Sequence, residues 1–166
     1  NITQANLTGS APHNATTTLG NIATVSDGND EIRNVNITWF GLGGVQGSKD
    51  LALDCPSCTV TISPGVTGIL FAGQNLTSAI TVTVPVGQSP GIYLARVVAS
   101  TSNAGSDTMI LNITIPSNAS WARTPTTFGT VITPPNSTGI IGNITVINLG
   151  NIKIPFEVIK SGDNGY

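Results

Sequence analysis

The stretch Ile80–Pro116, ITVTVPVGQSPGIYLARVVASTSNAGSDTMILNITIP, alternates apolar and polar residues in runs that are separated by turns rich in Gly, Ser, Pro and Asn. Because successive side chains of a strand point to opposite faces, each run predicts a β-strand with one buried face. In the last run we expect the core face to consist of Met109, Leu111, Ile113 and Ile115. Asn112 and Thr114 are then expected to point outward.

The same pattern continues upstream and predicts an all-β domain. It gives seven short strands, expected near residues 16–25, 32–40, 59–63, 68–72, 78–84, 91–100 and 108–115. Short strands with a turn every ~8–12 residues are typical of an immunoglobulin-like β-sandwich. Helical periodicity is nearly absent, and only residues 48–54 form a short helix candidate.

We divide the chain into four parts. Residues 1–14 are expected to form an N-terminal tail or donor strand, 15–116 the immunoglobulin-like sandwich, 117–126 a linker, and 127–166 a partial second β module. The partial module contains further strands near residues 127–133, 140–149 and 153–160. Because a sandwich needs two packed sheets, so few strands leave this module incomplete.

The partial module has an apolar side that nothing else in the chain is left to cover. This side consists of Ile140, Ile144, Val146, Ile154, Phe156 and Val158. Open strand edges beside an apolar face favour strand addition, so we expect a neighbouring copy to complete the module. The segment Ile2–Ser10 of that neighbour is a candidate donor. Truncation of a longer chain of several modules explains the same pattern.

Composition argues against several classes of partner. Only 8% of residues are charged and the formal net charge is −2, which leaves no basic patch for nucleic acid. The sequence contains no long apolar run of about eighteen residues, so we expect no membrane span. The hydrophobic content of 39% favours a folded core over disorder.

Nine of the sixteen asparagines begin the glycosylation acceptor Asn-x-Ser/Thr, more than twice the number that the Ser and Thr content would give by chance. They are Asn1, Asn6, Asn14, Asn36, Asn75, Asn112, Asn118, Asn136 and Asn143. In six of them the middle residue is Ile or Leu, so on a strand the Asn points outward. This density predicts a secreted, extracellular glycoprotein of an archaeon or a eukaryote, with N-linked glycans on the outer sheet faces.

The segment Gly87–Gly91 (GQSPG) matches the G-x-S-x-G pattern of a hydrolase nucleophile elbow. In that motif the residue after the serine supplies a backbone N–H to the oxyanion hole, and Pro90 has none. The single histidine, His13, also precedes Ser89, which is opposite to the hydrolase order. We therefore interpret this segment as a tight turn and predict neither catalytic residues nor a cofactor.

Cys55 and Cys58, in the sequence CPSC, fit a redox pair, half of a zinc site or a structural disulfide. Structural zinc needs four ligands and the chain has no other Cys, so we predict a disulfide that shapes the following turn. The cluster Asp27–Glu31 (DGNDE) offers oxygen ligands but lacks the spacing of a calcium loop. A polar turn is the preferred interpretation there, and no metal site is predicted.

Two segments resemble a known family. Ile80–Pro116 resembles the last three strands of the immunoglobulin-like, CARDB-type adhesion modules of archaeal and bacterial surface proteins. Gly142–Gly162, GNITVINLGNIKIPFEVIKSG, resembles the opening strands of such a module. Together with the dense sequons, these modules also resemble archaeal thread-like extracellular filaments and S-layer proteins. The resemblance implies a scaffold without catalytic residues.

These features together predict a structural subunit of an extracellular filament or S-layer, and not an enzyme. Its expected partners are copies of itself, joined through β-strand edges, and its own N-linked glycans. The alternative is an adhesin or carbohydrate-binding immunoglobulin-like module of a larger secreted protein. Trp39 and Trp121 fit a sugar-binding platform, but a core Trp and a linker anchor are the preferred interpretations.

Overall fold

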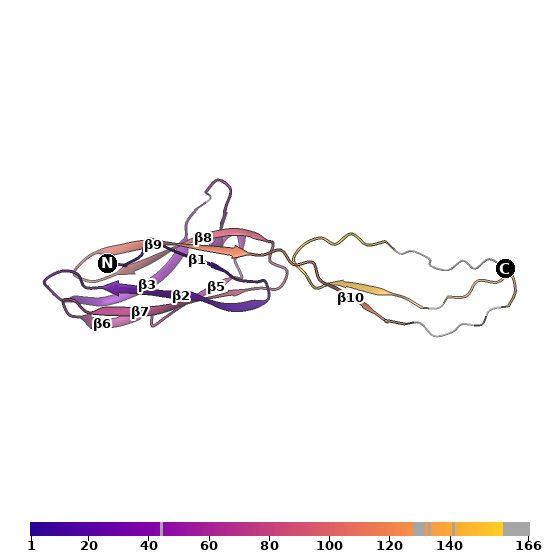
Figure 1. Cartoon of the computed structure of the whole chain (residues 1–166), viewed down its shortest axis with the longest axis horizontal. Coiled ribbons are helices and arrows are strands. Elements are labelled where there is room, and N and C mark those ends of the chain that lie inside the picture. The colour runs from indigo at the N-terminus through magenta and orange to yellow at the C-terminus, as the bar shows by residue number, and fades with distance from the viewer. Residues whose placement is uncertain (44, 128–131, 133, 141, 158–166) are drawn as a thin grey trace.

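Two β-sheets packed face to face form the larger part of the computed structural model, which describes residues 1–43, 45–127, 132, 134–140 and 142–157 (Figure 1). The large sheet has the strand order β1-β9-β8-β3-β6, with β4 beside β8, and the small sheet has the order β2-β7-β5. The bounds are β1 Asn6–Ser10, β2 Ala15–Val25, β3 Ile32–Gly41, β4 Lys49–Asp50, α1 Leu51–Asp54, β5 Thr59–Ser63, β6 Val66–Leu70, β7 Asn75–Val84, β8 Gly91–Ser100 and β9 Ser106–Ile115. The chain is therefore an all-β protein with an immunoglobulin-like sandwich.

The core lies between the two sheets and consists of alternate residues of the long strands. In β9 the expected inward residues are at most 2% exposed: Met109, Leu111, Ile113 and Ile115. The same alternation buries Tyr93, Ala95 and Val97 in β8 and Ile80, Val82 and Val84 in β7. Because full burial of one aliphatic side chain contributes about 1.5–3 kcal/mol, this shared layer is the main source of stability.

The strands expected from the sequence correspond to β2, β3 and β5–β9, with bounds that differ by a few residues. The helix candidate at 48–54 is only partly correct. Its first residues form β4, which pairs in parallel with β8, and its last four residues form α1. A segment this short gains little from helix propagation, so its geometry depends on capping and packing.

Asp50 caps α1 from a buried position. Its Oδ1 atom accepts hydrogen bonds from the backbone N–H groups of Ala52 at 2.8 Å and Leu53 at 3.1 Å, and Oδ2 accepts one from Gly43. Burial acts to raise the pKa of Asp50, and the backbone hydrogen bonds outweigh it, so the pKa lies below its usual value. Folding therefore favours the charged carboxylate.

The N-terminal segment, which we expected to be a tail or donor strand, contains strand β1. Strand β1 pairs in parallel with β9 of the same chain, and Ile2 is buried with its N–H donated to Asp107 at 2.6 Å. Gly9 permits close packing of β1 against β2 of the other sheet, since a β-carbon there would lie 2.7 Å from the Leu19 side chain. The strand edge of β9 is thus filled within the chain.

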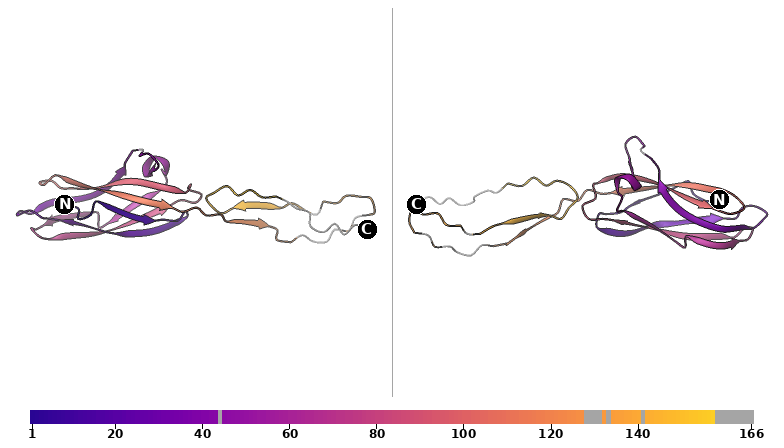
Figure 2. Two further views of the ribbon diagram at one scale, coloured as in Figure 1. Left: turned by 45° about the horizontal axis from the view of Figure 1, so that its top comes forward. Right: turned by 180° about the vertical axis from the view of Figure 1, so that it is seen from behind.

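The C-terminal part contains a two-stranded ribbon beyond one end of the sandwich, along its long axis (Figures 1 and 2). Strand β10, Trp121–Thr124, pairs antiparallel with β11, Thr145–Asn148. Strand β10 thus lies within the segment 117–126 that we expected to be a linker. The strand expected near 140–149 is present only as β11, and residues 153–157 form no strand. Most of the 127–133 strand and residues 158–160 lie outside the described residues.

Leu111→Ala is expected to lower the free energy of unfolding by about 2–5 kcal/mol, because it leaves a cavity in a fully buried layer. Ile110→Ala is the matched control, since Ile110 is the preceding residue of β9 and is 43% exposed. Denaturant unfolding of both variants measures the difference. Equal losses would contradict the position of the core.

Asp50 is expected to contribute to acid sensitivity. Since its pKa is lower in the folded state than the unfolded value of about 3.9, its stabilisation is present above that pH and is lost as pH falls through the folded pKa. Asp50→Asn should therefore be less stable than the native chain at pH 7, and the gap should shrink toward pH 2. Denaturant unfolding curves of both proteins across this pH range provide the measurement. A difference in the free energy of unfolding that does not change with pH would refute the prediction.

Candidate functional site

The β10–β11 ribbon has an apolar side with no second layer over it in the described residues. An open groove of about 390 Å³ lies on this side, lined by Trp121, Arg123, Ile144, Val146, Phe156 and Glu157. Trp121 is 53% exposed and Phe156 is 67% exposed. Because a two-stranded ribbon alone is marginally stable in water, this groove is a candidate interaction site among the described residues. We call it the ribbon groove.

Side-chain hydrogen bonds fix the ribbon to the end of the sandwich. The Asn118 N–H donates to Asn151 Oδ1 at 2.7 Å, and Asn151 Nδ2 donates to the Pro116 carbonyl at 2.9 Å. His13 is buried beside them, with its Nε2 atom 3.0 Å from Asn118 Nδ2 and its Nδ1 atom accepting from the Gly87 N–H. These contacts hold the ribbon groove in a defined position. Nothing in the sequence indicated that His13 contacts Asn118.

The nine sequon asparagines are distributed unevenly. All are exposed except Asn112, which is half-buried. Asn6, Asn36 and Asn112 lie on β1, β3 and β9, in phase with the outward residues of the large sheet. The side-chain amides of Asn1 and Asn118 contact Asp27 and His13, so these two are engaged within the chain. The expected outward orientation therefore holds on the strands, while occupancy stays a prediction.

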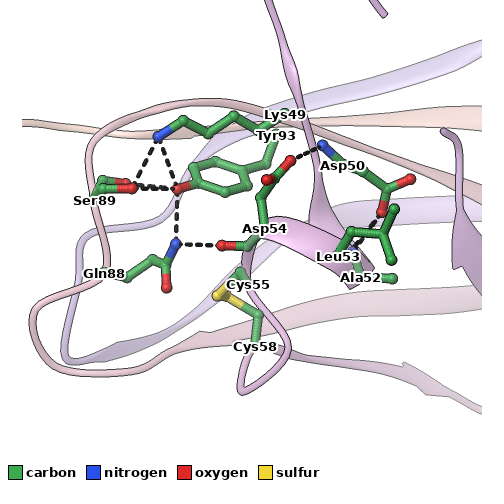
Figure 3. Close-up of a disulfide and its surroundings, with 10 residues drawn as sticks. All are labelled: Lys49, Asp50, Ala52, Leu53, Asp54, Cys55, Cys58, Gln88, Ser89 and Tyr93. Atoms are coloured by element: carbon green, nitrogen blue, oxygen red, sulfur yellow. Dashed lines mark hydrogen bonds between the residues drawn. A yellow bond between two sulfur atoms is a disulfide. The ribbon is translucent and has the colours of Figure 1, made fainter. Parts of the chain in front are cut away.

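The disulfide expected between Cys55 and Cys58 is present, with the two Cα atoms 5.3 Å apart (Figure 3). It closes the turn that follows α1, and both cysteines are buried. The Gln88 side chain donates to the Asp54 carbonyl at 2.9 Å and so joins this turn to the β7–β8 loop. Such structural disulfides are typical of proteins outside the reducing cytosol.

The structure brings Lys49 to the G-x-S-x-G turn, a contact that the sequence did not reveal (Figure 3). Lys49 Nζ donates to Ser89 Oγ at 2.9 Å, to the Pro90 carbonyl at 3.0 Å and to Tyr93 Oη at 3.3 Å. The cluster therefore fastens the turn over the buried ring of Tyr93.

The acidic turn Asp27–Glu31 places Glu31 beside Arg33, to which it is ion-paired. Among the described residues, no three His, Cys, Asp or Glu side chains are grouped as metal ligands.

In the same part of the chain, no helix has the length and apolar character needed to cross a membrane.

No family model and no curated protein matches this chain. The secreted serine protease VesC from Vibrio cholerae matches 69% of it at 15% identity, with a TM-score of 0.43. A family 123 glycoside hydrolase from Clostridium perfringens matches 68% at 12% identity, with a TM-score of 0.47. The ASH/PapD-like domain 7 of human CEP192 matches 70% at 12% identity, with a TM-score of 0.48.

These findings correct our expectation that the chain is not an enzyme. Two of the similar structures belong to a protease and a glycoside hydrolase, so the sandwich does not exclude an enzymatic protein. The chain covers 22% of the protease chain, 23% of the hydrolase chain and 84% of the PapD-like domain. At such identities the likeness shows the fold alone and assigns no activity.

Glycans are expected on most of the nine sequons, with the lowest occupancy at Asn1 and Asn118 because their amides are engaged in the folded chain. Glycopeptide mass spectrometry of the native protein gives the occupancy of each site. The exposed strand residues Asn6 and Asn36 are the internal comparison. Nine unmodified asparagines would refute the prediction.

Proposed function

We propose that this chain is a structural subunit of an extracellular polymer, a filament or an S-layer, which assembles through β-strand edges. The ribbon groove carries the proposal: it is an apolar surface beside two strands whose outer edges pair with no other strand among the described residues, at the end of the sandwich. A strand from a second copy would cover this surface and pair with one of these edges. Repeated addition that does not close on itself generates a fibre or lattice.

The chemistry of the groove favours a polypeptide strand as the occupant. Its sides combine apolar groups, Trp121, Val146 and Phe156, with one cation and one anion, Arg123 and Glu157. An added strand places alternate side chains into such a surface while its backbone pairs with an open edge. Burial of the exposed Trp121 and Phe156 would then provide most of the binding free energy.

The donor that we expected, Ile2–Ser10, is engaged within its own chain. Donation of this segment to a neighbour would remove Ile2, which is 6% exposed, from its own core and break the pairing of β1 with β9. Assembly with this donor is therefore an exchange of one paired strand for another, as in domain swapping. A strand from elsewhere in a longer polypeptide avoids that cost.

The ribbon groove is tested in the full-length chain with two substitutions on the same strand. Val146→Asp puts a charge into the groove and should abolish polymers seen by electron microscopy. Ile147→Asp, on the next residue of β11 and 45% exposed, is the control and should leave polymers intact. Polymers that form equally well with Val146→Asp would overturn the proposal.

The donor is tested separately by a cross-link that holds β1 on β9. Ser10 and Thr114 are register partners, so Ser10→Cys with Thr114→Cys offers a disulfide across this pair. If β1 is the exchanged strand, the oxidised variant should stay monomeric and the reduced variant should polymerise. The native chain under the same reducing conditions controls for Cys55–Cys58. Isolated native particles in every condition would favour a module of a larger secreted protein.

A further inference from the structure

The outer face of the small sheet is an array of threonines, which we call the threonine face. It is formed by Thr16, Thr18, Thr59, Thr61, Thr81 and Thr83, on three neighbouring strands. The register aligns them in two rows, with Thr83 between Thr16 and Thr59 and Thr81 between Thr18 and Thr61. Hydroxyl pairs link Thr16 to Thr83 at 2.9 Å and Thr18 to Thr81 at 3.0 Å.

The two outer faces of the sandwich differ in their sequons. The large sheet has Asn6, Asn36 and Asn112 on the strands of its outer face. The threonine face has sequon asparagines only at its margins: Asn14 precedes β2, and Asn75 is the first residue of β7. Since β2 and β7 are antiparallel, these two lie at opposite ends of the face. The rows of threonine between them are free of acceptor asparagines.

The threonine face also has no charged residue, because β2, β5 and β7 contain no Asp, Glu, Lys or Arg. Two identical faces can therefore meet without opposing like charges. Each hydroxyl has one proton and two lone pairs, so a Thr–Thr pair retains capacity for hydrogen bonds to a partner. The threonine methyl groups supply apolar area to the same contact.

We propose that the threonine face pairs with the threonine face of a second copy, so that neighbouring polymers associate side by side. Pairing of two single chains through this face does not require the proposed polymer. Only the repetition of the contact along a polymer rests on the proposed function. A two-fold contact of this kind is self-complementary, which is the commonest symmetry of protein pairs. Glycans on Asn6, Asn36 and Asn112 would then project from the opposite face of each sandwich, while those on Asn14 and Asn75 would stand at the margins of the contact, outside the rows of threonine.

The size of the face indicates a weak contact that gains strength by repetition. With a rise of ~3.3 Å per residue and a strand spacing of ~4.8 Å, the three strands cover about 400 Å² per copy. Two copies would bury about 800 Å², below the ~1,200 Å² of a stable isolated interface. Single chains should therefore pair transiently. A polymer that presents the face at every subunit gains avidity along its length.

Cross-linking of the full-length chain tests the contact without requiring polymers. Both native cysteines form the disulfide, so a single introduced cysteine reacts selectively with a short bis-maleimide. Thr81→Cys, on the middle strand of the threonine face, should give at least tenfold more covalent dimer than Thr108→Cys. Thr108 is an exposed threonine of β9 that belongs to no sequon, and it is the matched control. Equal dimer yields would overturn the inference.

Electron microscopy of Thr81→Lys and Thr108→Lys provides the second test. Lysines on the threonine face should separate laterally associated polymers into single ones, whereas Thr108→Lys should leave them associated. Bundles that persist in Thr81→Lys, or a glycan found on Thr81 by mass spectrometry, would overturn the inference. If native chains form no polymers but Thr81→Cys cross-links selectively, the proposed function fails and the threonine face stands.

Discussion

Burial of one apolar layer between two sheets is the constraint on which the rest of this structure depends. Because side chains alternate along a strand, placing Ile80, Val97 and Leu111 in that layer fixes the outward residues of the same strands. A shift of register by one residue would expose the whole apolar set, so register is strongly specified. The orientation of the sequon asparagines and of the threonines follows from the packing of the core.

That constraint gives the two outer faces different characters. The large sheet presents sequon asparagines such as Asn36, while the small sheet presents uncharged rows that include Thr18 and Thr81. The low charge of the chain, 8% of residues, means that neutral polar groups hydrate most of its surface. The two faces therefore differ in the way that the proposed subunit requires, with acceptor asparagines on one and an uncharged surface on the other.

The same alternation has a different consequence in the C-terminal ribbon. Strands β10 and β11 also carry apolar residues, but no second sheet lies over them in the described part of the chain. Trp121 and Phe156 are therefore exposed, in contrast to the buried Tyr93 of the sandwich. The hydrogen bonds of Asn118 and Asn151 nevertheless fix this part against the sandwich, which orders a surface that a partner strand could cover.

The sequence by itself determined the sandwich strands, the inward residues of β9 and the Cys55–Cys58 disulfide, because alternation and short-range spacing are local properties of a chain. Only the tertiary structure decided that β1 lies on its own β9, that β10 forms within the expected linker, and that Lys49 reaches Ser89. Each of these contacts joins segments that are distant in sequence. Their formation depends on which open strand edge or polar group lies nearby in the folded chain. The periodicity of the sequence does not contain that information.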